Sequence, residues 1–130
     1  MIVDSSALVA ILLREPGHER LLDALLAAPL VEVGAPTVVE TGIVLTHRLG
    51  DRGRSLLARL LVEAEIGVVD FSARHADAAL SAWHRYGRGR HPASLNYGDC
   101  LTYAVADVAA RPLLCVGSDF PATDLELVVT

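Results

Sequence analysis

The stretch around which the rest of this chain is organised reads LNYGDCLTYA and covers residues 95–104. It predicts a helix start, because Asn96 is a favoured N-cap and Asp99 falls in the first turn, where the helix dipole stabilises a carboxylate. Apolar residues then recur at helical spacing and predict one buried stripe, made of Leu101, Ala104, Val105 and Val108. Two interpretations of Asp99 are open: an acid that only stabilises the helix start, or a functional carboxylate with partners elsewhere in the chain.

The length and composition indicate one folded domain over residues 1–130. Hydrophobic residues make up 52% of the chain and charged residues 21%, a balance that excludes a disordered protein. No apolar run approaches the roughly 20 residues of a membrane-spanning helix. The opening residues MIVD carry no basic leader, so we expect no signal peptide. Cys100 and Cys115 form no CxxC pair, which favours reduced thiols and a cytoplasmic location.

The charged residues restrict the possible function classes. The net charge is −5, which argues against bulk attraction to nucleic acid but leaves room for a local basic edge. All eleven cationic side chains are arginine. The absence of lysine excludes a P-loop, Schiff-base chemistry, and the receiver-type and haloacid-dehalogenase phosphoacceptor sites that depend on a lysine.

Short apolar strands alternate with helices along the whole chain. We expect strands at residues 2–3, 30–33, 67–71, 113–116 and 125–129, with helices in the intervals. This alternation is typical of an α/β fold in which a mostly parallel sheet lies between two helical layers. The pattern leaves the order of the strands open.

Four local patterns give further expectations about the helices. Ser5 is expected to cap the first helix. Thr37 and Glu40 fit a capping box, which is the structural interpretation of Glu40. Gly50 is expected to end the same helix in a left-handed conformation. Ser72 is expected to cap a long helix whose inward face holds Ala76, Ala79, Leu80 and Trp83.

Four acids from distant segments are placed to meet at one edge of the predicted sheet. Asp4 directly follows the first strand, and Asp119 lies just past the fourth. Ligands of open α/β sheets gather at the carboxyl ends of the strands, and the helices that carry Glu40 and Asp99 begin at the same edge. Two further acids have similar positions and are not separated from these four by spacing, namely Asp70 and Asp124.

A cluster of these four carboxylates requires a cation. Carboxylates that share a site repel one another, so one of them takes up a proton unless a cation neutralises the group. Oxygen ligands of this kind select Mg²⁺ or Mn²⁺. Such an ion lowers the pKa of a bound water and stabilises charge on a phosphate, which suits phosphodiester hydrolysis. The alternative is that the acids serve as helix caps and surface charge.

Four segments of the chain resemble the motifs of PIN-domain ribonucleases, and specifically those of the VapC-type toxins of bacterial toxin–antitoxin pairs. The segments are MIVDSSA with Asp4, the helix after Pro36 with Glu40, NYGDC with Asp99, and GSDF with Asp119. Each motif alone is weakly specific, but the four occur in the right order. The likeness also includes the length of the chain and the order of its elements.

The resemblance implies a three-layer α/β/α sandwich and a Mg²⁺- or Mn²⁺-dependent endoribonuclease that cuts RNA by water attack, leaving a 5′ phosphate and a 3′ hydroxyl. By similarity, Asp4 and Asp99 are the expected direct metal ligands, and Glu40 and Asp119 complete the acidic pocket, bound to the metal directly or through water. Ser6 is expected to hydrogen-bond this site. The resemblance also implies a homodimer that is held inactive by a VapB-type antitoxin whose tail enters the cleft.

The loop before Asp99 reads RYGRGRHP over residues 85–92 and is rich in arginine. We expect Arg85, Arg88 and Arg90 to contact the RNA backbone, because a guanidinium group can bind a phosphate through two parallel hydrogen bonds. The other interpretation is a solvated loop whose arginines keep it soluble.

Two functions of different class follow from the sequence. One is the metal-dependent ribonuclease toxin. The other is a non-catalytic PIN-like module that binds RNA or protein and uses the acids as caps and surface charge. The complete set of four acids favours the enzyme, because folding does not demand all four.

Overall fold

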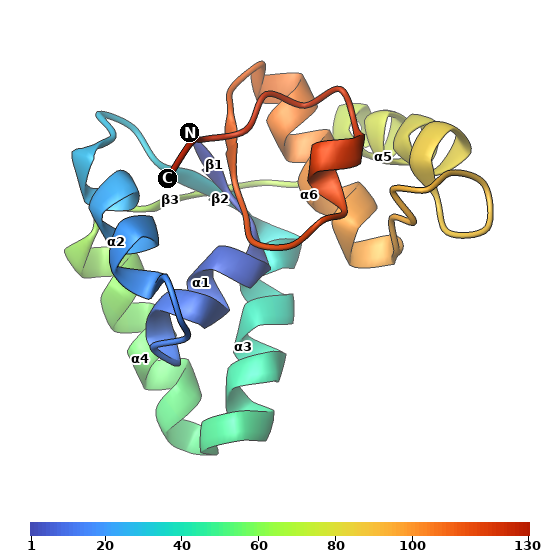
Figure 1. Ribbon diagram of the computed structural model, residues 1–130. Coiled ribbons are helices and arrows are strands. Elements are labelled where there is room, and N and C mark those ends of the chain that lie inside the picture. Colours follow the sequence, from blue (N-terminus) through green and yellow to red (C-terminus); the bar gives the residue numbers. More distant parts are fainter.

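A sheet of four short strands forms the centre of the computed structural model, which describes residues 1–130 (Figure 1). The strands are β1 (Ile2–Val3), β2 (Glu32–Gly34), β3 (Gly67–Val69) and β4 (Leu113–Leu114). The helices are α1 (Ser5–Leu12), α2 (His18–Ala27), α3 (Ala35–Leu49), α4 (Asp51–Glu63), α5 (Ala73–Tyr86) and α6 (Tyr97–Ala109). A single 3-10 turn, η1 (Phe120–Ala122), follows β4.

The strands lie in the order β3-β2-β1-β4, and all three pairings are parallel. Successive side chains of a strand point to opposite faces of the sheet, so each face receives its own core. Ile2 and Leu113 pack with α5 and α6, whereas Val3 and Leu114 pack with α1 to α4. The predicted three-layer α/β/α arrangement is confirmed, and the sheet is wholly parallel.

The strands are shorter than the sequence predicts, and one expected strand is absent. The segments 30–33, 67–71 and 113–116 form only β2, β3 and β4 within or beside those limits. The strand expected at 125–129 is wrong, because Leu127 makes no more than an isolated bridge with Leu113. An apolar run extends as a strand only while a neighbour offers backbone N–H and C=O groups, and β1 and β4 offer two residues each.

Two helix starts differ from the predicted ones. Asp4, and not Ser5, is the N-cap of α1. The start of α3 has no side-chain cap, so the capping box expected between Thr37 and Glu40 is wrong. Pro36 stands in the first turn of this helix, where its fixed φ favours helix formation without a capping side chain.

The other predicted helix boundaries are observed. Ser72 is the N-cap of α5, and its backbone N–H donates to His75 Nδ1 at 3.0 Å. Asn96 is the N-cap of α6 and forms a reciprocal capping box with Asp99. Gly50 ends α3 with a φ of +67°.

The face that α5 turns inward is not the predicted one. Of the four residues expected there only Ala79 is buried, whereas Leu80 is 61% exposed and Trp83 is 38% exposed. The buried side chains of this helix are His75, Ala79, Ala82 and Tyr86. Small residues let α5 pack closely on α6, which leaves its large apolar side chains on an outer face.

Helix α6 is buried on more sides than one stripe. Ala104 and Val105 are buried as predicted, but Thr102, Tyr103 and Ala106 on the other face are buried too. The helix lies against α5 and contributes to the core on one face of the sheet, and the segment after β4 covers it further (Figure 1). Few of its residues therefore reach solvent.

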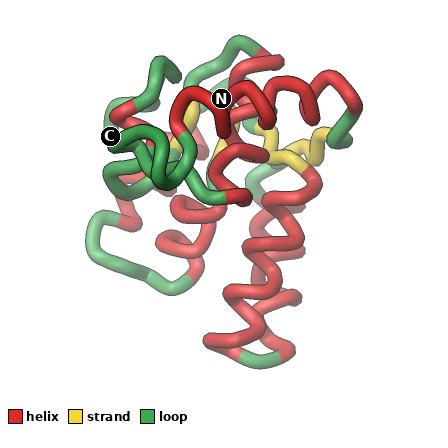
Figure 2. The backbone as a smooth tube through the Cα atoms, turned by 90° about the vertical axis from the view of Figure 1, so that its right-hand side faces the viewer, coloured by secondary structure: helices red, strands yellow, loops and turns green.

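Helices α3 and α4 form a hairpin that projects beyond the sheet (Figure 2). The two helices approach closely at Gly53, where a Cβ atom would lie 2.6 Å from the backbone carbonyl carbon and oxygen of Leu45. None of the helices combines the length and the apolar character that crossing a lipid bilayer requires.

Replacing Gly53 by Ala is expected to destabilise the protein by about 1–3 kcal/mol, because the added methyl group collides with backbone atoms that cannot move alone. Gly42 provides the matched control on α3, since a Cβ there would make an ordinary 3.8 Å contact with Leu57. Gly42→Ala is expected to stabilise the helix by up to about 1 kcal/mol. Urea unfolding followed by circular dichroism measures both effects, and equal midpoints for the two variants would contradict this packing.

Candidate active site

Asp4 is a buried acid at the carboxyl end of β1, with 4% of its surface exposed. Its Oδ2 atom accepts hydrogen bonds from the Ser6 N–H (3.1 Å) and the Ser6 hydroxyl (2.6 Å). Its Oδ1 atom accepts a hydrogen bond from the Thr102 hydroxyl of α6 (2.8 Å). A buried carboxylate is costly unless its oxygens find donors, and these three donors hold it in one orientation.

Ser6 links this acid to the segment after β4. Its hydroxyl donates to Asp4 and accepts the backbone N–H of Val116 at 3.0 Å. The backbone N–H of Asp4 in turn donates to the Leu114 carbonyl at 2.9 Å. The start of α1 and the end of β4 are therefore joined at this acid, and Ser6 lies where the resemblance to PIN domains places it.

A chain of hydroxyl groups on the other side of Asp4 was not anticipated from the sequence. Thr102 Oγ1 lies 3.1 Å from Thr37 Oγ1 of α3, and the Thr41 hydroxyl donates to the Thr37 carbonyl at 2.7 Å. All three threonines are buried. The available signal was the position of Thr102, which stands three residues after Asp99 and so lies near it on the helix.

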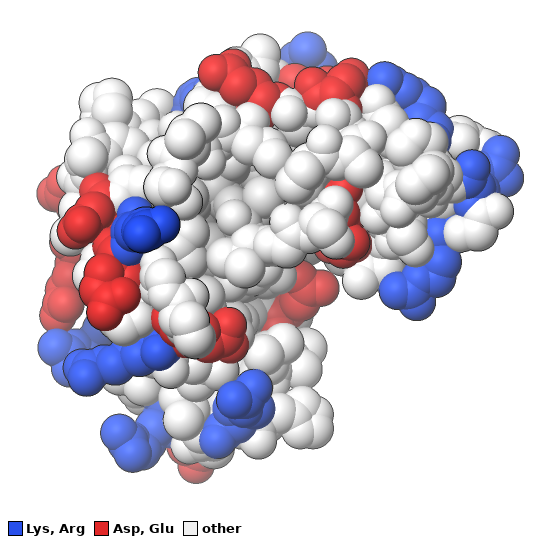
Figure 3. Space-filling view, in the orientation of Figure 1, with Lys and Arg blue, Asp and Glu red and all other residues white.

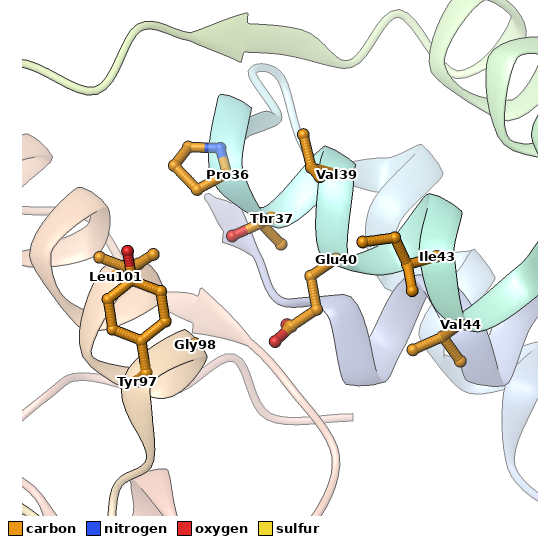
Figure 4. Close-up of a pocket in the computed structure, with 9 residues that line it drawn as sticks. All are labelled: Pro36, Thr37, Val39, Glu40, Ile43, Val44, Tyr97, Gly98 and Leu101. Atoms are coloured by element: carbon orange, nitrogen blue, oxygen red, sulfur yellow. The ribbon is translucent and has the colours of Figure 1, made fainter.

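Glu40 extends from α3 toward the start of α6 (Figure 4). Its Oε1 atom accepts a hydrogen bond from the Ser5 hydroxyl at 2.6 Å. Gly98 lies opposite, and a Cβ atom at that position would overlap with Glu40 Oε2. Glu40 thus faces an open pocket of about 490 Å³ between α3 and α6 instead of capping its own helix.

Asp99 lies half-buried at the start of α6 among the other three acids. Asn96 donates its backbone N–H to Asp99 Oδ2 at 3.0 Å, and the Asp99 N–H donates to Asn96 Oδ1 at 2.9 Å. Burial, reinforced by the negative charges of Asp4, Asp119 and Glu40, raises the pKa of Asp99 to about 6. Asp4, Asp119 and Glu40 thus lie near enough to Asp99 for their charges to add to the effect of burial on its pKa.

Asp119 is the exposed member of the group and lies in the segment between β4 and η1. Its side chain makes no hydrogen bond within the protein. The pKa of the neighbouring Cys115 thiol is raised to about 11, first by burial and then by the negative charges of Asp4, Asp119 and Asp99. Both cysteines are unpaired, as the sequence predicts.

The two acids that spacing could not assign lie elsewhere. Asp70 follows β3, the edge strand of the sheet, and is exposed. Asp124 accepts hydrogen bonds from the Tyr103 hydroxyl (2.5 Å) and from Arg85 Nη2 (3.0 Å). The hydrogen bonds from Tyr103 and Arg85 hold the pKa of Asp124 below its usual value. Neither acid is among the charges that dominate the pKa shift of Asp99.

The loop expected over residues 85–92 begins later than predicted, because Arg85 lies on the last turn of α5, and only Arg88 and Arg90 lie in the loop after that helix. Arg85 pairs with Asp124, and Arg90 Nε donates to the His84 carbonyl at 3.2 Å. Arg88 is exposed and has no side-chain partner. Figure 3 shows basic groups at one end of the molecule and carboxylates in the recess between its upper and lower parts. The structure thus brings Arg85 to Asp124 and leaves Arg88 free.

The donor set at this edge consists of hard carboxylate oxygens, which fit Mg²⁺ or Mn²⁺. In the arrangement observed, no three Asp, Glu, His or Cys side chains converge closely enough around one point to hold a metal ion. Asp119 is exposed and makes no side-chain hydrogen bond, whereas Asp4 is held by three donors.

The fold and the acidic edge together define the class of protein. A parallel sheet between helical layers with acids at the carboxyl end of its central strand agrees with a PIN domain, and the family model for the PIN domain matches residues 1–125. This is a PIN-domain protein.

Comparison with known proteins narrows the class. Ribonuclease VapC36 of Mycobacterium tuberculosis is 51% identical over 127 residues, which cover 97% of this chain and 91% of that protein. Ribonuclease VapC of Mycolicibacterium smegmatis is 44% identical over 128 residues, which cover 98% of this chain and 99% of that protein. The chain belongs to the VapC ribonuclease family.

Solved structures support the fold independently. The crystal structure of VapC20 from Mycobacterium tuberculosis, a Sarcin-Ricin loop cleaving toxin, matches with a TM-score of 0.80 at 20% identity and covers 98% of this chain and 97% of that one. A toxin–antitoxin complex from Klebsiella pneumoniae matches with a TM-score of 0.73 at 14% identity, covering 98% and 95%. At these identities the likeness concerns the fold.

The raised pKa of Asp99 predicts how stability depends on pH. The folded protein favours the neutral acid, so ionisation of Asp99 lowers stability as the pH rises from about 4 to above 6. Asp99→Asn removes this charge and keeps a carbonyl oxygen to accept the Asn96 N–H. With divalent cations removed by a chelator, we expect the melting temperature of Asp99→Asn to exceed that of the wild type by roughly 2–5 °C at pH 7.5 and by less than about 1 °C at pH 4. The difference is this small because Asp99 is partly exposed to solvent.

The matched control is Asp77→Asn, an exposed acid in the middle of α5 with no hydrogen-bond partner. Its melting temperature is expected to follow that of the wild type at both pH values. A pH-independent difference between Asp99→Asn and the wild type in scanning calorimetry would contradict the raised pKa of Asp99.

Proposed function

We propose that this chain is a Mg²⁺- or Mn²⁺-dependent endoribonuclease that acts as the toxin of a toxin–antitoxin pair. The single observation that supports the proposal is geometric: Ser5, next to Asp4, donates to Glu40, and the other oxygen of Glu40 faces Gly98, next to Asp99, so carboxylates from three segments lie beside one another. Such a group stores repulsion that a divalent cation relieves. Membership of the VapC ribonucleases supplies the expected substrate, RNA.

In this proposal Asp4, Asp99 and Asp119 hold the metal, and Glu40 completes the acidic pocket. The bound ion supplies a water of lowered pKa and neutralises charge on the phosphate. The chain's own contribution is orientation. Ser6 and Thr102 fix both oxygens of Asp4, and Ser5 fixes one oxygen of Glu40.

The hydrogen bonds that hold Asp99 and Glu40 leave one carboxylate oxygen of each available. Asp99 Oδ2 accepts the Asn96 N–H, so its Oδ1 is free to face the other acids. Glu40 Oε1 accepts the Ser5 hydroxyl, which leaves Oε2 above Gly98. Each of these carboxylates therefore has one oxygen committed to holding its position and one oxygen to offer a ligand.

We propose a homodimer, a VapB-type antitoxin and a cytoplasmic location for the same protein. Exposed apolar side chains on α3, α5 and α6 support a protein contact surface beside the acids, since large exposed apolar patches mark such surfaces. These side chains are Val39, Ile43, Leu80, Trp83 and Tyr97. The exposed apolar side chains support the proposed protein contacts, and the acids support the proposed RNA cleavage.

The non-catalytic module has one observation in its favour, which is that Asp4 and Asp99 both cap helices. Capping accounts for the hydrogen bond to one oxygen of each of these two acids. It does not explain why Glu40, which caps nothing, turns toward Gly98. The enzyme is therefore the better-supported function.

Asp99→Asn is expected to lower RNA cleavage by roughly 100-fold or more, because a proposed metal ligand is lost, while the protein stays folded. The assay uses total bacterial RNA with Mn²⁺, and sequencing of the new 5′ ends locates the cuts. Asp4→Asn is a poorer test, since its amide group would face the donors of Ser6 and Thr102 and destabilise the fold.

Asp77→Asn again serves as the control and is expected to cleave at the wild-type rate. Added Mn²⁺ should raise the melting temperature of the wild type and of the control, but not that of Asp99→Asn. Cleavage by Asp99→Asn at the wild-type rate would defeat the proposed function.

The loop arginines give a separate prediction about RNA binding. Arg88→Ala combined with Arg90→Ala is expected to weaken RNA binding and to reduce the salt slope of log K by up to about 1.4, from about 0.7 per phosphate contact on a single strand. Fluorescence anisotropy with labelled single-stranded RNA, in the Asp99→Asn background, measures this slope. The control pair is Arg20→Ala with Arg59→Ala on α2 and α4. An equal loss of RNA affinity and of salt slope in both pairs would show that the loop arginines are solvated and do not contact RNA specifically.

A further inference from the structure

Asp119 lies in a loop that begins and ends beside the same strand, β4. The loop leaves the sheet after Leu114 and returns beside the same strand, where the Leu113 N–H donates to the Glu126 carbonyl and the Val128 N–H donates to the Leu113 carbonyl, both at 2.9 Å. Between these points the backbone forms no strand and only the short turn η1. The position of Asp119 therefore depends on side-chain anchors along the loop.

Two anchors lie close to Asp119. The backbone N–H of Val116 donates to the Ser6 hydroxyl at 3.0 Å, and Phe120 is 3% exposed in the core beneath α5 and α6. Both fix the loop on the side where it leaves the sheet. Neither fixes the returning half.

On the returning half, Asp124 supplies side-chain hydrogen bonds in addition to the backbone bonds at Glu126 and Val128 and the packing of Leu125 and Leu127 against the core. Its carboxylate accepts the Tyr103 hydroxyl at 2.5 Å through one oxygen and Arg85 Nη2 at 3.0 Å through the other. Arg85 also donates to the Tyr86 hydroxyl at 2.8 Å and lies 4.8 Å from the centre of the Tyr86 ring. These contacts join the loop to α5 and α6 at once. We call Arg85, Tyr103 and Asp124 the clamp.

The clamp is related to the acidic site through α6. Tyr103 stands four residues after Asp99, one helical turn along the same helix, and Asp124 stands five residues after Asp119. The Tyr103 side chain is 2% exposed, so its ring fills a core position that phenylalanine could fill equally well. The hydroxyl adds a bond between the helix that carries Asp99 and the loop that carries Asp119.

We propose that Arg85, Tyr103 and Asp124 are positioning residues that set Asp119 relative to Asp99. The proposal rests on the proposed function, because it assigns the clamp a role in the metal site. The two hydrogen bonds hold the pKa of Asp124 below its usual value, which keeps the clamp ionised at neutral pH. Arg85 then acts on the site through Asp124.

The experiment compares the full-length wild type with Tyr103→Phe, Asp124→Asn and Asp107→Asn. Tyr103→Phe removes one hydroxyl without a change of charge or shape, and Asp107→Asn is the matched control, an exposed acid four residues further along α6. Amide hydrogen exchange by mass spectrometry reports on residues 116–122. Titration with MnCl₂, followed by the shift in melting temperature, reports on the metal site.

We expect amide exchange over residues 116–122 to be at least about 5-fold faster in Tyr103→Phe and Asp124→Asn, with α1 and α2 unchanged. We expect their Mn²⁺ affinity to fall roughly 10-fold, as for residues that orient metal ligands. A double variant no worse than Asp124→Asn alone is expected if the groups act as one unit. Asp107→Asn should match the wild type in both measurements.

Unchanged exchange over residues 116–122 in both clamp variants overturns the proposal, whatever their metal response. Faster exchange with wild-type Mn²⁺ affinity also overturns it, because the clamp would then be merely structural. Failure of the wild type itself to respond to Mn²⁺ counts against the proposed function and against the positioning role alike, while the exchange data still decide whether the clamp holds the loop.

Discussion

A carboxylate buried without a cationic partner is the constraint on which the rest of this structure depends. Asp4 is 4% exposed and is neutralised by no basic side chain, so its oxygens need donors from the protein itself. The donors come from α1 and α6, and their own partners lie in α3 and the segment after β4. Satisfying one acid thereby joins α1, α3, α6 and a loop around it.

The class of fold could be predicted from the sequence because it follows from topology, and the same topology is the basis for the expectation that the four acids approach one edge of the sheet. Alternating apolar strands and helices impose a parallel sheet, and parallel strands send their carboxyl ends to one edge. Asp4 and Asp119 follow adjacent strands, β1 and β4, although the order of the strands was needed to see that they are neighbours. Asp70 could not be separated from these acids by the same reasoning, because only the observed strand order shows that β3 lies at the far edge of the sheet.

Side-chain partners could not be predicted, because they depend on distances between elements. Glu40 fitted a local capping box, yet its partner is Ser5, 35 residues away. Arg85 pairs with Asp124, 39 residues away, a contact that its neighbours in sequence do not indicate. The inward face of α5 was misjudged for a related reason. Close packing on α6 selects small residues, and a count of apolar positions does not show which face a neighbour requires.

The double use of the acids links stability to the chemistry of the site. Asp99 stabilises the start of α6 through its capping box, but burial near three other carboxylates raises its pKa and favours its neutral form. A residue selected for the helix alone would be Asn or Ser at the cap and any good helix former three residues later. Asp99 therefore combines two opposing effects, a favourable capping hydrogen bond and an unfavourable charge in a half-buried position near other carboxylates.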